Sequence, residues 1–124
     1  MIYKLRTSEK TQEIFSKLGQ ASGLQPYTLS KLALAFSLRK GELSASDFEN
    51  DSNGIELNRQ TIFGETELLF RCLIVQNEGR SLSDEEFFPR LAKAHLDRGA
   101  VIMNEESKYN RNFFINLCRL DENL

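Results

Sequence analysis

A short break between two helical segments, Gly23 to Pro26, constrains the fold of this chain more than any other feature of its sequence. Glycine readily adopts the left-handed conformation that ends a helix, and the fixed φ of proline suits the first turn of the next one. We therefore predict a first helix that Thr7 or Ser8 caps and that ends at about Ser22. A second helix is predicted at about 27–40.

Apolar residues recur along both predicted helices at the spacing of a buried helical face. In the first helix they are Ile14, Phe15, Leu18 and Ala21, and in the second they are Leu29, Leu32, Ala33, Phe36 and Leu38. Residues 1–6 precede them as a short strand, with Lys4 and Arg6 on one face and Leu5 on the other. The first 41 residues therefore have the order strand, helix, helix.

Charge is unevenly divided along the 124 residues. Residues 1–41 hold seven basic and two acidic side chains, a net charge of +5, whereas residues 42–124 hold nine basic and sixteen acidic ones, a net charge of −7. This asymmetry points to a polyanionic partner on the basic side, and a solvated charged face is the alternative. The candidate DNA-binding residues are Lys4, Arg6, Lys10, Lys17, Lys31 and Lys40.

The acidic part, 42–124, is predicted to form a mostly helical body within the same single domain, 1–124. Its loosest stretch is 42–61, which contains a turn signal and a short strand beginning at Ile55. Three helices are predicted, at 65–77, 83–99 and 105–120. Ser83 and Glu86 have the spacing of a capping box for the second of these.

The ends and buried faces of these three helices follow from the same signals. Gly99 is expected to end the helix at 83–99. The side chains expected to face inward are Leu68, Leu69, Cys72 and Leu73 in the first, Phe87, Phe88, Leu91, Ala92, His95 and Leu96 in the second, and Tyr109, Phe113, Ile115, Leu117 and Cys118 in the third.

The order strand, helix, helix is typical of a ribbon-helix-helix module, in which short strands of two protomers pair and the helices share a core. A lone strand of five or six residues leaves its edges unpaired, so it needs a partner strand or a covering element. We therefore predict a mainly α fold with a ribbon-helix-helix-like N-terminal unit, extended by a small helical body, in a homo-oligomer. A plain helical hairpin is the alternative.

The chemistry of the basic segment favours the DNA backbone over the bases. Lysine, a point charge suited to phosphates, outnumbers arginine in residues 1–41. The strand offers Lys4 and Arg6 for a phosphate or a guanine, but no Asn or Gln to read adenine. The free N–H groups at the start of the second helix, after the turn at Gly23–Thr28, are a further place for a phosphate.

No catalytic or metal-binding arrangement is visible, so we expect a non-enzymatic protein without a cofactor. His95 is the only histidine, and its apolar neighbours are typical of a packed side chain. Cys72 could act as a nucleophile beside it, but a buried, hydrophobic cysteine is favoured. Two cysteines and one histidine do not form a metal cluster. Without a secretory signal, we expect reduced thiols and a cytoplasmic protein.

Four stretches of the sequence carry a family resemblance: Tyr3–Ser8, Thr28–Leu38, Gly54–Glu65 and Ala94–Gly99. They are similar to DndE, a family of DNA sulfur modification (phosphorothioation) proteins, and the resemblance covers essentially the whole chain. Gly54–Glu65 is the most specific stretch, because the pattern of the second helix would fit many helical hairpins.

The resemblance implies a non-enzymatic subunit that binds double-stranded DNA, including nicked duplex, through lysines on the surface of a homotetramer. It implies sulfur-transfer and ATPase-like partner subunits, which together replace a non-bridging phosphate oxygen by sulfur. The lysines that match by position are Lys4, Lys10, Lys17, Lys31 and Lys40. The resemblance assigns no role to Glu56, Asn58 and Arg59, which we interpret as a conformation-setting hydrogen-bond cluster or, alternatively, as a partner contact.

Two other functions are consistent with parts of the sequence. A ribbon-helix-helix transcriptional regulator would prefer one short, two-fold symmetric operator, and the few base-reading residues in the strand count against it. An enzyme acting on DNA, such as a nickase, would need a metal site or an activated nucleophile, and neither is visible.

Overall fold

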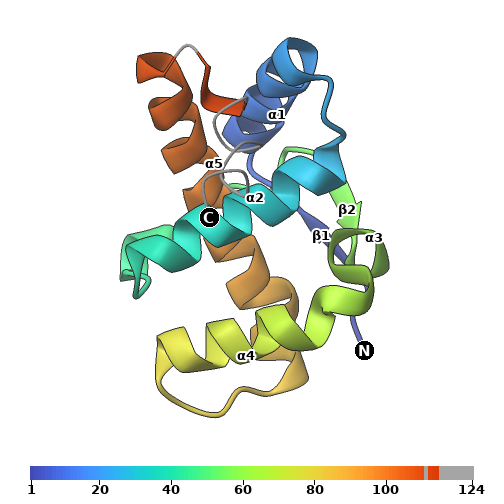
Figure 1. The fold of residues 1–124 in the computed structure, drawn as a ribbon. Helices are drawn as coiled ribbons and strands as arrows, with labels where there is room; N and C mark the ends of the chain where they lie inside the picture. The colour runs from blue at the N-terminus through green and yellow to red at the C-terminus, as the bar shows by residue number, and fades with distance from the viewer. Residues whose placement is uncertain (111, 115–124) are drawn as a thin grey trace.

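The computed structural model describes residues 1–110 and 112–114. In chain order its elements are β1 (Lys4–Arg6), α1 (Glu9–Ser22), α2 (Pro26–Lys40), the 3-10 turn η1 (Ala45–Phe48), β2 (Glu56–Asn58), α3 (Arg59–Phe63), the 3-10 turn η2 (Gly64–Thr66), α4 (Glu67–Glu78), the π-helical segment η3 (Glu86–Leu91) and α5 (Ala92–Tyr109). Helix α2 crosses the middle of the molecule, with α1 and α4 on opposite sides of it (Figure 1). The prediction of a mainly α chain is confirmed.

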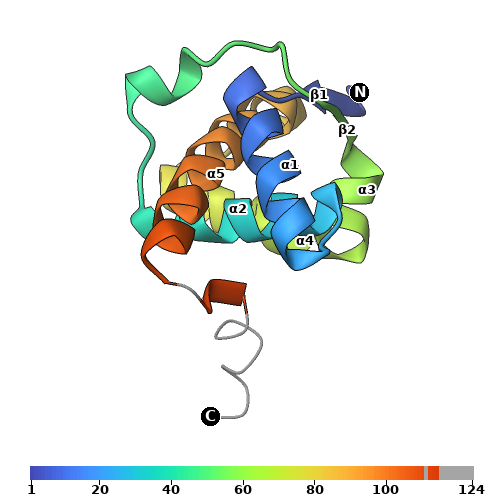
Figure 2. The same ribbon diagram turned by 90° about the horizontal axis from the view of Figure 1, so that it is seen from above.

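Strand β1 pairs with a strand of its own chain. Lys4, Leu5 and Arg6 lie opposite Asn58, Leu57 and Glu56 of antiparallel strand β2. The segment 41–55, which runs along one side of the molecule, brings the chain back to β1 (Figure 2). We predicted that the partner strand of β1 comes from a second protomer, but it is β2 of the same chain. Because β1 has a partner strand in its own chain, it does not need one from a second protomer. The prediction of a homo-oligomer therefore depends on the family resemblance alone.

The first helix begins and ends where the sequence predicts. The Oγ atom of Ser8 accepts a hydrogen bond from the N–H of Thr11 at 3.1 Å, and Gly23 ends the helix at φ 78°. Buried Asp97 of α5 accepts hydrogen bonds from the N–H of Ser8 at 3.1 Å and from the Oγ1 of Thr11 at 2.7 Å. Its other oxygen pairs with Lys93 at 2.5 Å, so α5 fixes the start of α1.

Helices α2 and α5 cross in very close contact. A Cβ atom at Gly99 would lie 1.7 Å from the carbonyl oxygen of Ala33, so only glycine fits there. Arg98, the next residue back, donates hydrogen bonds to the carbonyls of Ser37 at 2.6 Å and Gly41 at 2.5 Å and thereby caps the end of α2. The prediction that Gly99 ends a helix was wrong, because this glycine serves packing inside α5.

The buried face of α4 also differs from the prediction. Leu68, Leu69 and Leu73 are 73%, 58% and 38% exposed, and Cys72 is exposed as well. Phe70 and Ile74 are buried instead. The cause is an aromatic cluster in which the ring of Phe63 lies 5.6 Å from that of Phe70 and 5.4 Å from that of Phe87. Burying these large rings turns the leucines towards solvent.

The capping box before η3 is confirmed. The N–H of Ser83 donates to the carboxylate of Glu86 at 3.1 Å, and the N–H of Glu86 donates to the Oγ of Ser83 at 3.2 Å. The chain then departs from a regular helix, because Phe88 has an extended conformation and the Phe88–Pro89 peptide bond is cis. The long helix α5 follows η3 directly and runs from Ala92 to Tyr109.

The prediction of a separate helix at 105–120 was wrong for its described part. Residues 105–109 belong to α5, and Tyr109 at its end is 87% exposed. Phe113 is buried as predicted, and its ring stacks on that of Phe36 at 5.6 Å. Ile115, Leu117 and Cys118 lie outside the described residues. Within the described part of the chain, no helix combines the length and the apolar character needed to cross a bilayer.

Candidate nucleic-acid interface

The two cations of β1 point outward, as predicted, and interact with their neighbours. Lys4 and Arg6 are exposed, whereas Leu5 between them is buried. The Nζ atom of Lys4 lies 3.8 Å from the carboxylate of Glu56, and Arg6 donates a hydrogen bond to the carbonyl of Gly54 at 3.0 Å. Both partners of the Lys4–Glu56 pair are at least half exposed, so this pair is weak.

The candidate lysines of the helices lie on α1 and α2. Lys10 and Lys17 are exposed on α1, seven residues apart and hence nearly in line along the helix. Lys31 is half-buried on α2, and Lys40 is exposed at its last residue. That end of α2 lies away from β1, so the six predicted residues spread across the molecule rather than forming one cluster (Figure 1).

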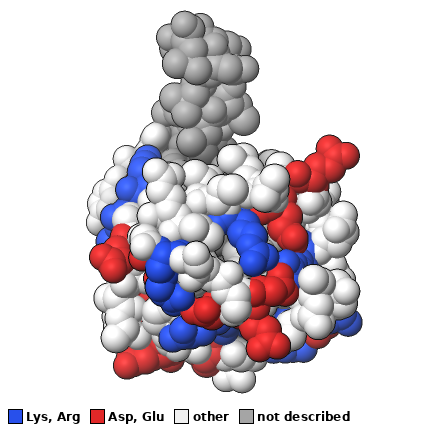
Figure 3. Space-filling model, turned by 90° about the horizontal axis from the view of Figure 1, so that it is seen from below, with Lys and Arg blue, Asp and Glu red and all other residues white. Residues whose placement is uncertain are grey.

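Most of the candidate cations in residues 1–41 have no ion pair, whereas most of the described cations in the acidic body, residues 42–124, have one. In the described ranges 1–110 and 112–114, the basic side chains without an ion pair are Arg6, Lys10, Lys17, Lys31, Lys40 and Arg90. Those paired with carboxylates are Lys4, Arg39, Arg59, Arg71, Arg80, Lys93, Arg98 and Lys108. Figure 3 views the molecule from the side of α4 and shows basic and acidic side chains intermixed. The unpaired cations are therefore concentrated in residues 1–41.

The start of α2 has neither a side-chain cap nor an acid in its first turn to compensate its dipole. The N-cap residue Gln25 makes no side-chain capping hydrogen bond, Pro26 follows it, and the first turn contains no acid. By contrast, the start of α1 has a side-chain cap, Ser8, and an acid in its first turn, Glu9. The exposed start of α2 is thus a partial positive charge available to an anion, as the sequence predicts.

A groove of about 490 Å³ separates the C-terminal parts of α1 and α5. Its described lining contains no acid and consists of Lys17, Leu18, Ala21, Ser22, Ser107, Lys108, Asn110, Asn112, Phe113 and Phe114. Lys17 brings an unpaired charge to this groove, whereas Lys108 is paired with Glu105 at 3.2 Å and the hydroxyls of Ser22 and Ser107 donate to the carbonyls of Leu18 and Asn104. Lys17 is therefore a cation beside a groove whose described lining contains no acid to oppose an anionic ligand.

The predicted packed histidine is confirmed. His95 is completely buried, and its Nδ1 atom lies 2.8 Å from the Oγ of Ser37 on α2. Burial, together with the nearby charge of Arg98, lowers the pKa of His95 to about 4. Cys72 lies on the exposed face of α4, so its predicted burial was wrong. In the described part of the chain, no group of three or more His, Cys, Asp or Glu side chains could hold a metal ion.

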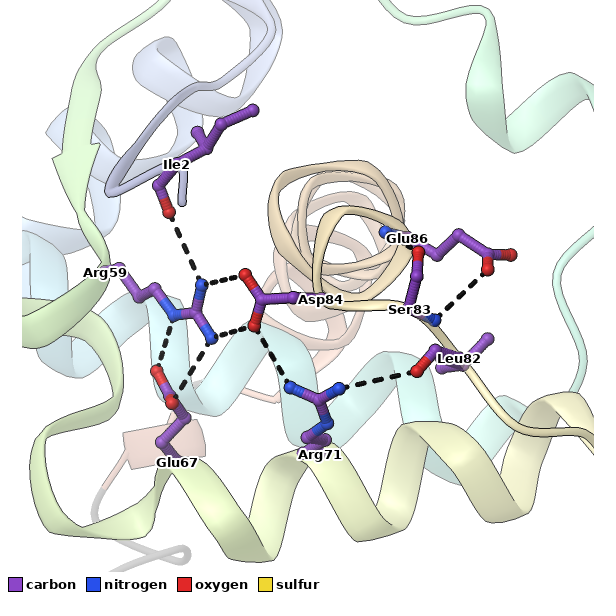
Figure 4. Close-up of polar contacts among 8 residues, drawn as sticks. All are labelled: Ile2, Arg59, Glu67, Arg71, Leu82, Ser83, Asp84 and Glu86. Carbon is purple, nitrogen blue, oxygen red and sulfur yellow. Dashed lines mark hydrogen bonds and ion pairs between the residues drawn. The ribbon is translucent and has the colours of Figure 1, made fainter.

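Arg59 is the centre of an ion-pair network that joins four parts of the chain (Figure 4). Its guanidinium is 5% exposed and binds Asp84 through two hydrogen bonds of 2.8 and 3.0 Å. It also donates to Glu67 at 2.7 Å and to the carbonyl of Ile2 at 3.4 Å. Arg71 adds a second contact to Asp84 at 3.1 Å. The network thereby connects the N-terminus, α3, α4 and the segment before η3.

The charges in this network stabilise each other. The hydrogen bonds from Arg59 lower the pKa of Asp84 to about 2, and the two carboxylates raise the pKa of Arg59 above its ordinary value. The guanidinium also lies over the rings of Phe87 and Phe88, at 5.4 and 5.2 Å from their centres. Arg59 is therefore a buried structural cation, inaccessible to DNA.

The predicted hydrogen-bond cluster of Glu56, Asn58 and Arg59 is confirmed only in part. Asn58 caps α3, because its Oδ1 accepts a hydrogen bond from the N–H of Gln60 at 2.8 Å. Glu56 contacts Lys4 and not Arg59. Sequence reasoning missed the main partner, Asp84, because a separation of 25 residues leaves no local signal.

The chain matches the family model described as "DNA sulphur modification protein DndE" over residues 4–111. The solved structure of DndE from Escherichia coli B7A, described as involved in DNA phosphorothioation modification, is 20% identical, covers 83% of this chain and 97% of its own, and has a TM-score of 0.67. A DndE variant with two glycine-to-lysine substitutions is 19% identical, with coverages of 82% and 97% and a TM-score of 0.64. No curated protein matches. The family match spans most of the sequence, and the chain therefore belongs to the DndE family of DNA sulphur modification proteins.

Proposed function

We propose that this chain is a non-enzymatic, DNA-binding subunit of a DNA phosphorothioation system. In this role it holds duplex DNA, nicked duplex included, through contacts between its surface cations and backbone phosphates. The chain acts as a homotetramer beside sulfur-transfer and ATPase-like subunits, which carry out the replacement of a phosphate oxygen by sulfur.

The observation that carries this proposal is the contrast in ion pairing. The body neutralises nearly all its described cations with its own carboxylates, whereas Lys10, Lys17, Lys31 and Lys40 of α1 and α2 have none within 4 Å in the described part of the chain. A lysine without an internal partner loses no ion pair when it binds a phosphate, so counterion release contributes fully to binding.

Two neighbouring features support phosphate binding at the same helices. The groove beside Lys17 has no acid in its described lining, which contains several uncharged polar residues. The uncapped start of α2 offers backbone N–H groups and a positive helix dipole. Neither feature distinguishes one base from another, so the expected affinity depends on salt and only weakly on sequence.

The test is the double variant Lys10→Gln/Lys17→Gln, which removes two exposed charges from one line of α1. We expect weaker binding to every duplex tested, with the slope of log affinity against log salt reduced by about 2, since each lost phosphate contact reduces it by about 1. Fluorescence anisotropy with intact and nicked duplexes at four salt concentrations measures both quantities.

The matched control is Arg80→Gln, because Arg80 is an exposed cation of the body already paired with Glu86 at 2.7 Å. This substitution removes a positive charge that Glu86 already neutralises. The slope of log affinity against log salt should therefore stay unchanged. If the α1 variant kept the wild-type slope, or if both variants lowered it equally, the assignment to the free lysines would be wrong. Competition with unrelated duplexes separates this proposal from an operator-binding regulator, which would discriminate strongly among them.

A further inference from the structure

The groove between the C-terminal parts of α1 and α5 contains an aromatic side chain that the core only partly covers. Segment 112–114 lies between the ends of these two helices (Figures 1 and 2). Phe113 is buried, with its ring stacked on that of Phe36 at 5.6 Å. Phe114 follows it, lines the groove and is half-buried. The packing of Phe113 on the core therefore holds Phe114 at the groove.

The ring of Phe114 has a face that Phe113 does not cover. The two rings are nearly perpendicular, at 77°, with their centres 5.0 Å apart. In such a pair the edge of one ring meets the face of the other, so Phe113 covers at most one face of Phe114. Among the described residues, no other aromatic ring contacts Phe114. A flat ring of a ligand in the groove therefore has a surface on which to stack.

The groove also offers one unpaired cation and one unpaired amide. Lys17 of α1 has no ion pair with a described residue, whereas Lys108 of α5 is paired with Glu105. Asn112 is exposed, and its side-chain amide has no hydrogen bond to a described residue, although its backbone N–H donates to Asn110. An amide both donates and accepts hydrogen bonds, as the edges of the bases do.

The remaining wall suits the uncharged part of such a ligand. Leu18 and Ala21 provide apolar surface, and the described lining contains no acid. Glu13 lies one turn before Lys17 on α1, but it is outside this lining and forms no ion pair with Lys17. The volume of about 490 Å³ is within the ~300–1,000 Å³ of small-ligand sites. An aromatic face, an amide, a cation and an apolar wall together match the parts of a nucleotide.

We propose that this groove holds one unpaired nucleotide of a DNA strand. Its base stacks on Phe114, Asn112 contacts the edge of the base, and Lys17 binds the adjoining phosphate. The inference rests on the proposed DNA-binding function and adds to it a contact with a base. The family match ends at residue 111, so Asn112 and Phe114 lie beyond the part of the chain that it covers.

The energy of stacking limits the site to nucleotides that are already outside the double helix. Stacking on one aromatic side chain raises affinity roughly tenfold. Taking a paired base out of an intact duplex costs at least as much, whereas an unpaired base is extruded at little cost. Intact duplex should therefore bind through its phosphates alone. The groove should add affinity only where a base is unpaired, as beside a gap or at a frayed nick.

Two bulged duplexes test this with the full chain by fluorescence anisotropy. One carries a single unpaired thymine, and the other carries an abasic residue at the same position. The two probes have the same phosphates and differ only in the base. The wild-type chain should bind the thymine bulge roughly tenfold more tightly than the abasic one. Equal affinities for the two probes would overturn the proposal.

Variants of Phe114 assign this difference to its ring. Phe114→Leu removes the aromatic face and keeps an apolar side chain, so the affinities for the two bulges should become equal. Phe114→Trp should preserve the difference. Phe48→Ala is the control, because Phe48 is an aromatic residue, 37% exposed, outside the described lining of this groove. Circular dichroism checks that each variant folds. A Phe114→Leu chain that still prefers the thymine bulge would overturn the assignment to this ring.

Photocrosslinking locates the base on the wild-type chain without any substitution. A 5-iodouracil in place of the bulged thymine loses its iodine on irradiation and forms a carbon–carbon bond to an adjacent aromatic ring, with release of hydrogen iodide. The bond should form within the tryptic peptide 112–119, which contains Phe113 and Phe114. A crosslink confined to other peptides would place the base elsewhere and overturn the groove as its site.

The outcomes also separate this inference from the proposed function. Salt-dependent binding of all duplexes, with no difference between the two bulges, overturns the nucleotide site while the proposed function stands. A wild-type chain that binds neither the intact duplex nor either bulge overturns both.

A preference for the thymine bulge that Lys10→Gln/Lys17→Gln weakens in the same proportion as binding to the intact duplex would remove Lys17 from the nucleotide site. The stacking on Phe114 would then stand alone.

Discussion

Substituting Gly99 by alanine tests the closest backbone approach that any of the seven glycines makes. The added Cβ would lie 1.7 Å from the carbonyl oxygen of Ala33 and 2.4 Å from its carbon. A carbon atom normally approaches a carbonyl oxygen to about 3.3 Å, so α2 and α5 would have to separate by roughly 1.5 Å. Both obstructing atoms belong to the backbone, and no side-chain rotation can relieve the contact.

The expected loss of stability follows from two opposing terms. Overpacking of this kind destabilises by about 1–3 kcal/mol, and the backbone position of the clash favours the upper end. Alanine regains about 1 kcal/mol of helix propensity, which leaves a net loss of about 2 kcal/mol. For a chain of 124 residues, unfolding entropy near 2.1 cal/mol/K per residue converts this into a Tm lowered by about 8 °C.

Differential scanning calorimetry measures this shift, and Gly19→Ala provides the matched control. Gly19 also lies within a helix, but its Cβ would stand 3.2 Å from the carbonyl oxygen of Leu24, where a shift of a few tenths of an ångström suffices. Its propensity gain is the same, so its Tm should change by only a few degrees in either direction. Equal effects of the two substitutions, or a Gly99→Ala protein as stable as the wild type, would refute the close crossing.

Two further predictions concern pH. The pKa of His95 is lowered from 6.5 to about 4, so between these pH values the unfolded chain binds a proton and the folded chain does not. The free energy of unfolding should therefore fall by on the order of 3 kcal/mol as the pH is lowered from 6.5 to 4. Urea unfolding at several pH values should show this loss, and His95→Phe should remove it. The pKa of Asp84 is lowered to about 2, so its stabilisation is present above its ordinary pKa of 3.8 and is lost as the pH falls towards 2. Asp84→Asn leaves Arg59 buried with one carboxylate partner fewer, so it should lower the urea midpoint at pH 7 and flatten the acid limb; an unchanged midpoint would contradict the role given to this pair.

Local signals predicted the parts of the fold that local chemistry determines. Ser8 and Gly23 bound α1, and Ser83 with Glu86 forms the capping box, because each of these interactions spans only a few residues. Gly99 shows the limit of such signals. Glycine is favoured both at helix ends and at close helix crossings, and only the position of α2 decides between them.

The prediction of the buried face of α4 was wrong for a related reason. Leu68, Leu69 and Leu73 have the spacing of a buried stripe, but so do Phe70 and Ile74, and one short helix cannot bury both sets. The choice depends on the rings of Phe63 and Phe87, which approach from other elements. Periodicity identifies the faces of a helix without telling which one meets the core.

The candidate DNA-binding residues could be named from the sequence, but not ranked. The charge asymmetry identified the basic segment, and exposure of Lys10, Lys17 and Lys40 agrees with it. Ion pairing needs three-dimensional distances, and it is what separates the free Lys17 from Arg39, which pairs with Glu106 on α5 at 2.5 Å. From the sequence, Arg59 was identified only as part of a motif to which no role could be assigned, although it forms ion pairs with both Glu67 and Asp84.

The uneven pairing of charges also affects how the chain would approach a polyanion. Its net charge of −2 repels DNA weakly at long range, but this repulsion is screened beyond about 8 Å at physiological ionic strength. Within that distance α1 and α2 present the unpaired lysines, with the exposed acids Glu9 and Glu13 among those of α1, while the side of α4 offers neutral pairs and leucines. Under the proposed function, encounter with DNA would therefore be selective for orientation, with the unpaired lysines towards the duplex and the leucines of α4 facing away.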